Sequence, residues 1–213
     1  YRLIEGMLIA GIACGATQAY VYLRSEYPLA REILGHAIAR AREAGWLGAN
    51  VADSGRAFDI ELRVGAGAYI CGEETGLLES IEGKKGQPRF KPPFPANFGL
   101  YGKPTTINNT ETFAAIPFIL GMGGEAYLNI GKPNNGGTKL FSVSGHVNRP
   151  GNFEVPMGTP FSKLLEMAGG MRGGRKLKAV IPGGSSAPVL PADVIMDCTM
   201  DYDSIAKAGS MLG

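Results

Sequence analysis

Residues 58–75 read FDIELRVGAGAYICGEET, and this stretch decides the fold. From Phe58 to Val64 apolar and polar side chains alternate, which is the pattern of a β-strand with one buried face. A glycine-rich turn follows from Gly65, and the carboxylates Glu73 and Glu74 are favoured in the first turn of a helix by the helix dipole. A strand, a glycine-rich turn and a helix N-terminus in this order are typical of the ligand-binding edge of an open α/β sheet.

The residues before this stretch predict the rest of the layer. We expect a largely apolar helix over Leu3 to Ala16 and a strand over Gln18 to Arg24, which is rich in β-branched and aromatic side chains. Pro28 opens a second helix that Gly45 ends. Its expected buried face comprises Leu29, Ile33, Leu34, Ala37, Ile38 and Ala41. Helix, strand, helix, strand predicts the α/β class with a mostly parallel sheet.

The second half of the chain predicts a different kind of unit. We expect a strand over Lys139 to Val143, a turn at Arg149 to Asn152 and a returning strand over Phe153 to Val155. A short helix over Phe161 to Ala168 and a strand over Leu177 to Ile181 follow. Strand, hairpin, helix and strand indicate a small α+β unit of the β-grasp, ubiquitin-like type.

The centre of the chain is rich in loops. Lys, Pro, Gly and Phe dominate from Gly83 to Pro104, which excludes a regular helix or a central strand there. A helix is expected from Asn108 towards Leu120, with Glu111 completing a capping box. Residues 133–137 are rich in Asn and Gly and are interpreted as a linker. We therefore predict an α/β domain over 1–132 and a β-grasp domain over 138–213.

Composition excludes several classes of protein. Among 213 residues the net charge is +2 and no basic run occurs, which argues against a nucleic-acid binder acting through bulk charge. No apolar stretch reaches the roughly 18 residues of a membrane span. The 32 glycines are dispersed between periodic segments and suggest tight turns and close approach of the backbone to a ligand. Three isolated cysteines make no disulfide framework, and Cys14 and Cys71 are expected to be buried structural residues.

The glycine-rich turn leaves two interpretations open. Its position suits a nucleotide, but Ile70 stands where a dinucleotide fingerprint needs a third glycine. The alternative is a turn that only lets strand and helix pack closely. Glu73 and Glu74 point about 100° apart on a helix and can address two different neighbours. Because they would repel phosphate, we expect them to face hydroxyl and amide groups of a ligand.

Four further residues are candidates for binding. Lys91 and Phe94, held among prolines, would offer a cation to a phosphate and a ring to a base, unless they are only a solvated lysine and a packed phenylalanine. Asn108 and Asn109 are either ligand contacts or no more than a helix cap. No catalytic dyad, zinc motif or Ser-His-Asp arrangement is evident, and the sequence predicts no catalytic side chain and no metal ligand.

Four motifs carry a resemblance to a known family. They are GAGAYICGEET over Gly65 to Thr75, KPPFP over Lys91 to Pro95, GKPTTINNTET over Gly102 to Thr112, and IPGGSS over Ile181 to Ser186. All four resemble the NADH-binding flavoprotein subunit of respiratory complex I, which is the F subunit in bacteria and the 51 kDa subunit in mitochondria. The resemblance covers the chain from end to end, and the same module occurs in NAD-linked hydrogenases and formate dehydrogenases.

The resemblance implies a fold and an activity. The fold is a partial FMN-binding α/β domain followed by an SLBB domain of β-grasp type. The reaction is hydride transfer from NADH to FMN, after which single electrons pass to iron–sulfur clusters towards quinone. Tyr69, Gly72, Glu73 and Glu74 would line the flavin and the nicotinamide. Lys91 and Phe94 would lie along NADH, and Asn108 and Asn109 would contact the flavin.

The resemblance also implies partners and a location. The 2Fe-2S thioredoxin-like subunit and the large iron–sulfur subunit would bind the protein on the cytoplasmic side of the bacterial inner membrane, or on the matrix side in a mitochondrion, without membrane insertion. The family's phosphate loop and the cysteines of its 4Fe-4S cluster are not in this sequence, so we expect an internal piece that is inactive alone. The alternatives are the same module in a hydrogenase or formate dehydrogenase, and a non-catalytic β-grasp ligand-binding protein.

Overall fold

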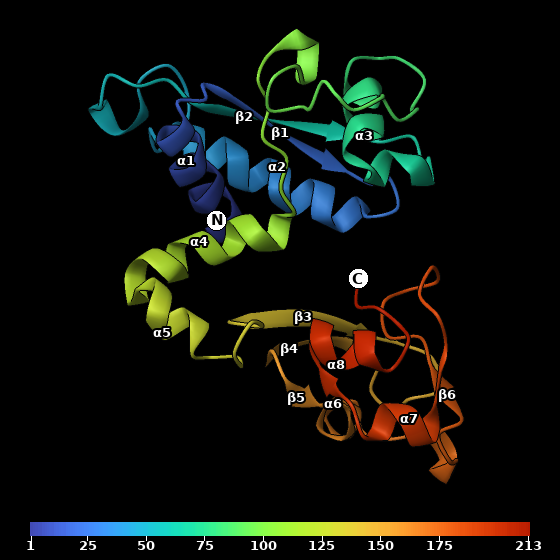
Figure 1. Ribbon diagram of the computed structural model, residues 1–213. Helices are drawn as coiled ribbons and strands as arrows, with labels where there is room; N and C mark the ends of the chain where they lie inside the picture. Colours follow the sequence, from blue (N-terminus) through green and yellow to red (C-terminus); the bar gives the residue numbers. More distant parts are fainter. The chain divides into compact units, whose positions relative to one another are not determined.

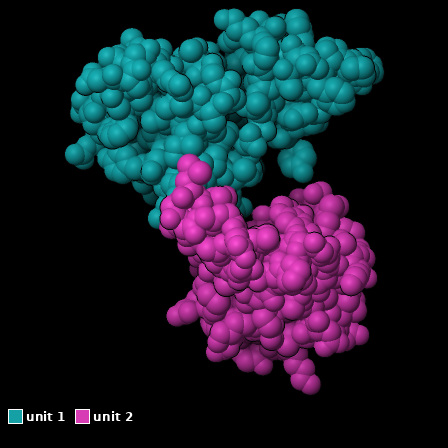
Figure 2. Space-filling view, turned by 60° about the vertical axis from the view of Figure 1, so that its left-hand side comes forward, with its two compact units in different colours: residues 1–117 teal, residues 118–213 magenta.

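A computed structural model describes residues 1–213, and the chain folds into two compact units, Tyr1–Pro117 and Phe118–Gly213 (Figures 1 and 2). Helices and strands occur in both units, so the predicted mixture of an α/β layer and a small α+β unit is confirmed. The domain limits 1–132 and 138–213 stay a prediction. No helix is long and apolar enough to span a membrane.

The first unit is built on two parallel strands with two helices against them (Figure 1). α1 (Arg2–Cys14) leads into β1 (Gln18–Leu23), and α2 (Pro28–Glu43) leads into β2 (Asp59–Val64). The pairing runs in register from Gln18 opposite Asp59 to Leu23 opposite Val64. Parallel pairing is the expected result of joining two strands through a helix. The predicted order of helix, strand, helix and strand is therefore confirmed.

The core of this unit lies between the helices and the strands. Phe58 and Ile60 are almost fully buried, and Ile38 of α2 packs in the same cluster. Gly11 is required in α1 because a Cβ there would stand 2.1 Å from the Phe58 ring. The other buried members of this cluster are Ile4, Met7, Leu8, Val21, Ala41, Leu47 and Val51.

Three side chains expected in this core lie outside it. Cys14 is exposed, because the buried face of α1 ends at Gly11, and its Sγ donates to the carbonyl oxygen of Ala10 at 2.8 Å. Leu29 and Ile33, at the start of α2, are also exposed, whereas Ile38 and Ala41 at its other end are buried. The apolar periodicity of α2 is correct, but only its C-terminal half is covered by the sheet and α1.

After β2 the chain turns through a 3-10 helix at Tyr69–Gly72 into α3 (Glu74–Ile81). The irregular stretch from Gly83 to Pro104 follows, with one further 3-10 turn at Leu100–Gly102. Leu78 and Ile81 of α3 pack against Leu100, so the loop is folded back onto this helix. The loop therefore carries its residues to the surface of α3.

α4 (Thr110–Met122) begins one residue later than the capping box predicted. Asn109 caps it, because its Oδ1 accepts from the Glu111 N–H at 2.8 Å. Asn108 lies before the cap and is not the capping residue. The helix ends at Gly123, whose φ of 89° lies in the left-handed region that favours glycine.

The second unit begins at Phe118, within α4, and continues with α5 (Gly124–Leu128) and a β-hairpin. β3 (Thr138–Val143) and β4 (Gly151–Pro156) are antiparallel, with Phe141 opposite Phe153. The two strands of the hairpin and α6 (Phe161–Met167) are present as predicted. The turn expected over Arg149 to Asn152 was placed too late, because Gly151 and Asn152 already pair with Val143 and Ser142 in β4. The remaining elements of the second unit are short: β5 (Thr159–Pro160), β6 (Ala179–Val180), β7 (Leu190–Pro191), α7 (Ala192–Met196), β8 (Thr199–Met200) and α8 (Tyr202–Lys207). A 3-10 turn at Arg172–Gly174 also lies in this unit, and another at Val51–Asp53 lies in the first unit.

These short elements were mostly missed because a two-residue strand has no periodicity to detect. The strand expected over Leu177 to Ile181 is limited to β6, which pairs with β7, and β5 pairs with β8. The elements are held by one core, in which Ile195 and Ile205 are fully buried. The other members include Phe141, Val155, Met157, Phe161, Leu164, Leu190, Cys198 and Met200.

The Asn- and Gly-rich stretch before the hairpin is folded against α8. Asn135 is buried, and its amide donates to Asp203 Oδ2 at 2.7 Å. Its Oδ1 accepts from the Tyr202 N–H at 3.0 Å. Lys132 Nζ lies 2.7 Å from Oδ2 of the fully buried Asp201, which caps α8. These contacts make the stretch part of the second unit's packing.

Candidate functional site

The N-terminus of α3 is the centre of the candidate site. Glu73 is the capping residue, and its Oε2 accepts from the N–H groups of Thr75 and Gly76, each at 2.9 Å. The hydroxyl of Thr75 donates to the same oxygen at 2.5 Å. A helix leaves its first N–H groups without partners, and a side-chain oxygen at this position satisfies them. Glu73 therefore has a structural role through Oε2, while its Oε1 accepts no hydrogen bond from the helix.

The local sequence makes this turn possible. Gly67 has a φ of 94°, which a side chain rarely adopts. A Cβ on Gly76 would stand 2.8 Å from the carbonyl oxygen of Ile70, so only glycine lets the 3-10 turn lie directly on the first turn of α3. The glycine-rich turn thus lets the 3-10 turn and α3 pack closely, as the alternative to a nucleotide-binding turn expected.

Lys91 joins the two glutamates. Its Nζ lies 3.4 Å from Glu73 Oε1 and forms a short ion pair with Glu74 Oε1. The three side chains are 31%, 34% and 40% exposed for Lys91, Glu73 and Glu74 respectively, so all remain reachable. The hydrogen bond with Glu74 raises the pKa of Lys91. The Thr75 hydroxyl, with help from the Gly76 N–H and Lys91, lowers the pKa of Glu73 against the opposing effect of burial.

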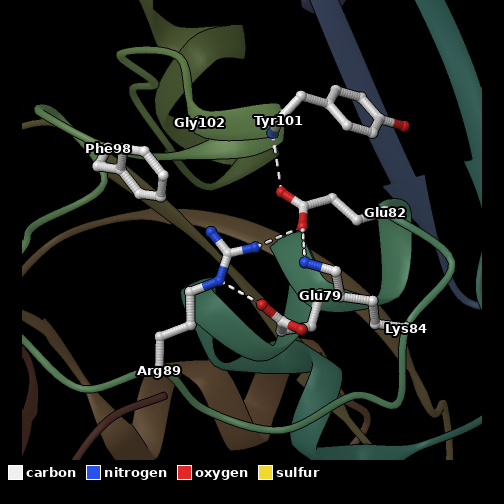
Figure 3. A pocket seen from close by; sticks show the side chains of 7 residues that line it. All are labelled: Glu79, Glu82, Lys84, Arg89, Phe98, Tyr101 and Gly102. Carbon is white, nitrogen blue, oxygen red and sulfur yellow. Dashed lines mark hydrogen bonds and ion pairs between the residues drawn. The ribbon is translucent and has the colours of Figure 1, made fainter.

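A partly buried ion-pair network holds the loop that carries Lys91. Arg89 Nε lies 2.5 Å from Glu79 Oε1, one terminal nitrogen lies 2.8 Å from Glu82 Oε2, and the other donates to the carbonyl oxygen of Gly99 at 3.2 Å. Figure 3 shows the Glu82 carboxylate between Arg89, Lys84 and the backbone of Tyr101. The backbone N–H of Arg89 also donates to Thr75 Oγ1 at 2.8 Å. Arg89 thereby fixes the loop to α3 through both its side chain and its backbone N–H.

Glu82 is the most strongly perturbed carboxylate of this network. Burial raises its pKa, but hydrogen bonds from Lys84, Arg89 and the Tyr101 N–H outweigh that effect and lower it to about 2. Its side chain is only 7% exposed. The open pocket beside it has a volume of about 770 Å³ and is lined by Glu79, Glu82, Lys84, Arg89, Phe98, Tyr101 and Gly102. Every charged side chain at the floor of this pocket is paired, which indicates a structural clamp.

The structure brings three of the eight predicted residues into direct contact, namely Glu73, Glu74 and Lys91. Tyr69 and Gly72 belong to the adjoining 3-10 turn, where Tyr69 is 81% exposed. A Cβ on Gly72 would meet nothing within 4 Å, so the backbone there is open. These two residues could therefore receive a ligand beside the glutamates.

The other three predicted residues are not joined to this cluster by any hydrogen bond or ion pair. Phe94 follows Lys91 in the loop with an exposed ring. Asn109 is occupied in capping α4, as the plainer interpretation allowed. Asn108 is exposed, and its side-chain amide makes no hydrogen bond. A free amide offers a ligand both a donor and an acceptor.

Sequence reasoning missed Thr75 and Arg89. Thr75 lies inside the quoted motif, and a hydroxyl two residues after a capping carboxylate is the signal that could have identified it. Arg89 gave no signal, because its partners Glu79 and Glu82 are reached only after the loop folds back. Cys71 is buried, as expected for a structural cysteine. No group of three or more His, Cys, Asp or Glu side chains is arranged to hold a metal ion.

Comparison with known proteins finds one family in each part of the chain. A family model described as the Nuo51 FMN-binding domain matches residues 1–118, and one described as the SLBB domain matches residues 140–190. The F subunit of NADH-quinone oxidoreductase from Rickettsia bellii (strain OSU 85-389) is 54% identical over the whole chain and 52% of that protein. The F subunit of the Rhodobacter capsulatus enzyme is 55% identical over the whole chain and 50% of that protein.

A solved structure agrees. The crystal structure of an NAD+-reducing NiFe-hydrogenase in its H2-reduced state is 40% identical, with a TM-score of 0.79 over 90% of this chain and 32% of that one. The chain spans about half the length of the curated relatives it matches. Since the first family model covers more than half of the residues of this chain, the chain belongs to the Nuo51 FMN-binding domain family, with an SLBB domain following the FMN-binding domain.

Proposed function

We propose that this chain is the central part of an NADH dehydrogenase flavoprotein, in which hydride passes from NADH to FMN and single electrons then leave for iron–sulfur clusters towards quinone. The observation that carries the proposal is the cluster of Glu73, Glu74 and Lys91 at the N-terminus of α3, exposed in a member of the Nuo51 FMN-binding family. The names of the curated relatives, F subunits of NADH-quinone oxidoreductase, agree with this activity.

The residues present fit a flavin mononucleotide. The ring and ribityl chain of FMN offer N–H, O–H and carbonyl groups, which need acceptors and donors in return. Glu73 Oε1 and the Glu74 carboxylate are exposed acceptors, and the Asn108 amide is free to donate. The open backbone at Gly72 lets a flat ring approach closely. When bound, FMN supplies the hydride acceptor and the means of releasing electrons one at a time.

The side chains of this chain would bind and orient. Glu73 takes the flavin side and Glu74 the nicotinamide side, while Tyr69 and Phe94 offer exposed rings along the ligand. Lys91 offsets the charge of both glutamates, which otherwise would repel the phosphates of NADH. No general base is required, because in direct hydride transfer no side chain has to accept a proton. Asn109 uses its Oδ1 to cap α4.

The test is made on the full-length protein. We expect it to bind FMN, detected by flavin absorbance after gel filtration, and to oxidise NADH with an artificial electron acceptor. The 213-residue chain alone should bind FMN weakly or not at all, because these residues include no phosphate loop. A full-length protein without flavin would refute the enzyme and favour a β-grasp ligand-binding protein.

A second candidate is the same module in an NAD-linked hydrogenase, which the hydrogenase structure at 40% identity favours. A formate dehydrogenase is the third setting for such a module. The higher identity of the two NADH-quinone oxidoreductase proteins argues for complex I. In that setting the partners would be the 2Fe-2S thioredoxin-like subunit and the large iron–sulfur subunit, at the cytoplasmic or matrix side of the membrane. Co-purification of the native complex identifies the partners.

A further inference from the structure

One buried hydroxyl, that of Thr75, donates to the carboxylate of Glu73. We propose that Thr75 is a positioning residue for the reaction: its hydroxyl turns one Glu73 oxygen into the helix and leaves the other for the ligand and Lys91. The inference rests on the proposed function, because it gives Glu73 a role towards a bound ligand. Thr75 itself is 1% exposed, so its side chain is closed to a ligand.

The direction of the Thr75 hydroxyl is determined by its neighbours. The backbone N–H of Arg89 can only donate, so Thr75 Oγ1 accepts from it at 2.8 Å. The single hydroxyl proton is then available for Glu73 Oε2, which lies 2.5 Å away. An ionised carboxylate can only accept, so this bond cannot run the other way. The chain Arg89 N–H to Thr75 O–H to Glu73 therefore has one polarity.

The hydroxyl adds a third hydrogen bond to the Glu73 oxygen that already caps the helix, and the other oxygen stays open. Oε2 receives three donors: the Thr75 hydroxyl, the Thr75 N–H and the Gly76 N–H. Rotation of the carboxylate would break all three bonds at once. Oε1 has only Lys91 Nζ, at the long distance of 3.4 Å. That oxygen keeps the capacity to accept from a ligand N–H or O–H group.

The same hydroxyl ties the loop to the helix. Arg89 is held by Glu79, Glu82 and the Gly99 carbonyl through its side chain, and by Thr75 through its backbone. Lys91 lies two residues further along. Loss of the Thr75 hydroxyl would therefore loosen both the carboxylate and the cation that faces it.

The experiment uses the full-length, FMN-loaded protein. Thr75→Val keeps the volume and removes the hydroxyl, whereas Thr75→Ser keeps the hydroxyl. We expect T75V to lower kcat/KM for NADH roughly tenfold, the effect of one lost hydrogen bond to a charged group. T75S should restore kcat/KM close to wild type, which a purely steric role would not do.

A double-mutant cycle with Glu73→Gln tests whether Thr75 acts through Glu73. If it does, T75V added to E73Q lowers kcat/KM little further. Full multiplication of the two losses, or a T75V enzyme with wild-type kinetics, overturns the positioning role. If E73Q alone leaves both FMN binding and NADH oxidation unchanged, the proposed role of Glu73 fails. That result can be told apart from failure of the Thr75 positioning role, in which E73Q lowers activity and the two losses multiply. Should T75V not fold, Thr75→Cys takes its place in the same cycle.

The matched control is Thr199→Val in the second unit. The Thr199 hydroxyl donates to Asp201, which also caps a helix and contacts a lysine. We expect T199V to lower the melting temperature while leaving kcat/KM for NADH unchanged. A kinetic loss in T199V as large as that in T75V would show a general effect of destabilisation and would count against the inference.

Discussion

Glu73 in the first unit and Asp201 in the second make nearly the same contacts. Each caps a helix, Glu73 through two backbone N–H groups and Asp201 through one. Each also accepts from a threonine hydroxyl and faces a lysine. They differ in burial: the Asp201 side chain is 0% exposed and that of Glu73 is 34% exposed. The partners of a capping carboxylate therefore do not by themselves distinguish a structural group from a binding group.

The two carboxylates also differ in which oxygen is occupied. Both oxygens of Asp201 are engaged, Oδ1 by the Ser204 N–H at 2.9 Å and Oδ2 by Lys132 at 2.7 Å and Thr199. In Glu73 the bonds converge on Oε2, and Oε1 retains only a distant lysine. A ligand site needs such a free, exposed oxygen. Asp201 is a structural group for that reason, and Glu73 is suited to both roles.

The largest effect is expected at the buried carboxylate. Asp201→Ala should lower the free energy of unfolding of the second unit by about 3 kcal/mol, because it removes a helix cap and a buried partner of Lys132. Chemical denaturation measures the change. Glu166→Ala, at an exposed ion pair with Lys163, is the control and should change little. Equal stability of the two variants would contradict the comparison.

Glu82 predicts a pH dependence of stability in the first unit. Its pKa of about 2 lies below the ordinary value of 4.5, so the unfolded state binds more protons between these values. The stabilisation is complete above about pH 4.5 and is lost as the pH falls towards 2. Glu82→Gln should cost about 2–3 kcal/mol near pH 7.

Denaturation of wild type and E82Q over a pH series measures this contribution. The difference between them should shrink on acidification, because the wild-type carboxyl group becomes neutral as well. A difference that stays constant down to about pH 3 would show that the ionisation of Glu82 is not the cause. Lys84→Ala provides a milder control, since its side chain is 61% exposed.

A kinetic effect is expected at the exposed carboxylate. In the full-length protein, Glu74→Gln should lower kcat/KM for NADH about tenfold to a hundredfold through a lost ligand hydrogen bond, with FMN retained. Removal of its negative charge near the phosphates should strengthen the binding of NADH or NAD+ and so partly offset this loss. Steady-state kinetics and a thermal melt on one sample separate the possibilities. Unchanged kinetics with a slightly lower melting temperature would leave Glu74 as a partner of the helix dipole.

The smallest effect on stability is expected at Lys91. Lys91→Gln removes the cation between the two glutamates, whose side chains are partly solvated. We expect an unchanged melting temperature and a raised KM for NADH, because two uncompensated carboxylates repel its phosphates. The rise in KM should grow at low salt, where repulsion is screened less. A KM independent of salt would argue that Lys91 faces no phosphate.

Much of the fold was predictable from sequence because it depends on neighbours along the chain. The alternation in β2, the proline at the start of α2 and the apolar runs of β3 and β4 are local signals, and each element is present. The two glutamates were also recognised as residues of a helix N-terminus, which their order after a glycine-rich turn indicates. Helix and strand periods are properties of short segments, so one sequence carries them.

Burial and the geometry of the site were decided by tertiary structure. Cys14 lies among apolar residues in the sequence, yet it is exposed, because the buried face of α1 ends at Gly11. The short pairs β5–β8 and β6–β7 form only when distant segments meet. Each of these outcomes depends on which surface covers which, and a local period does not contain that information.

The amino-acid sequence by itself determined that a carboxylate pair would stand at a helix N-terminus after a parallel strand, since chain order and local propensity suffice for that. Only the tertiary structure decided the direction of the Thr75 hydroxyl, whose proton points to Glu73. That direction depends on Arg89, fourteen residues beyond Thr75, donating its backbone N–H to the Thr75 hydroxyl oxygen. A hydrogen bond has a direction and a distance, and these exist only once the loop from Gly83 to Pro104 has folded onto α3.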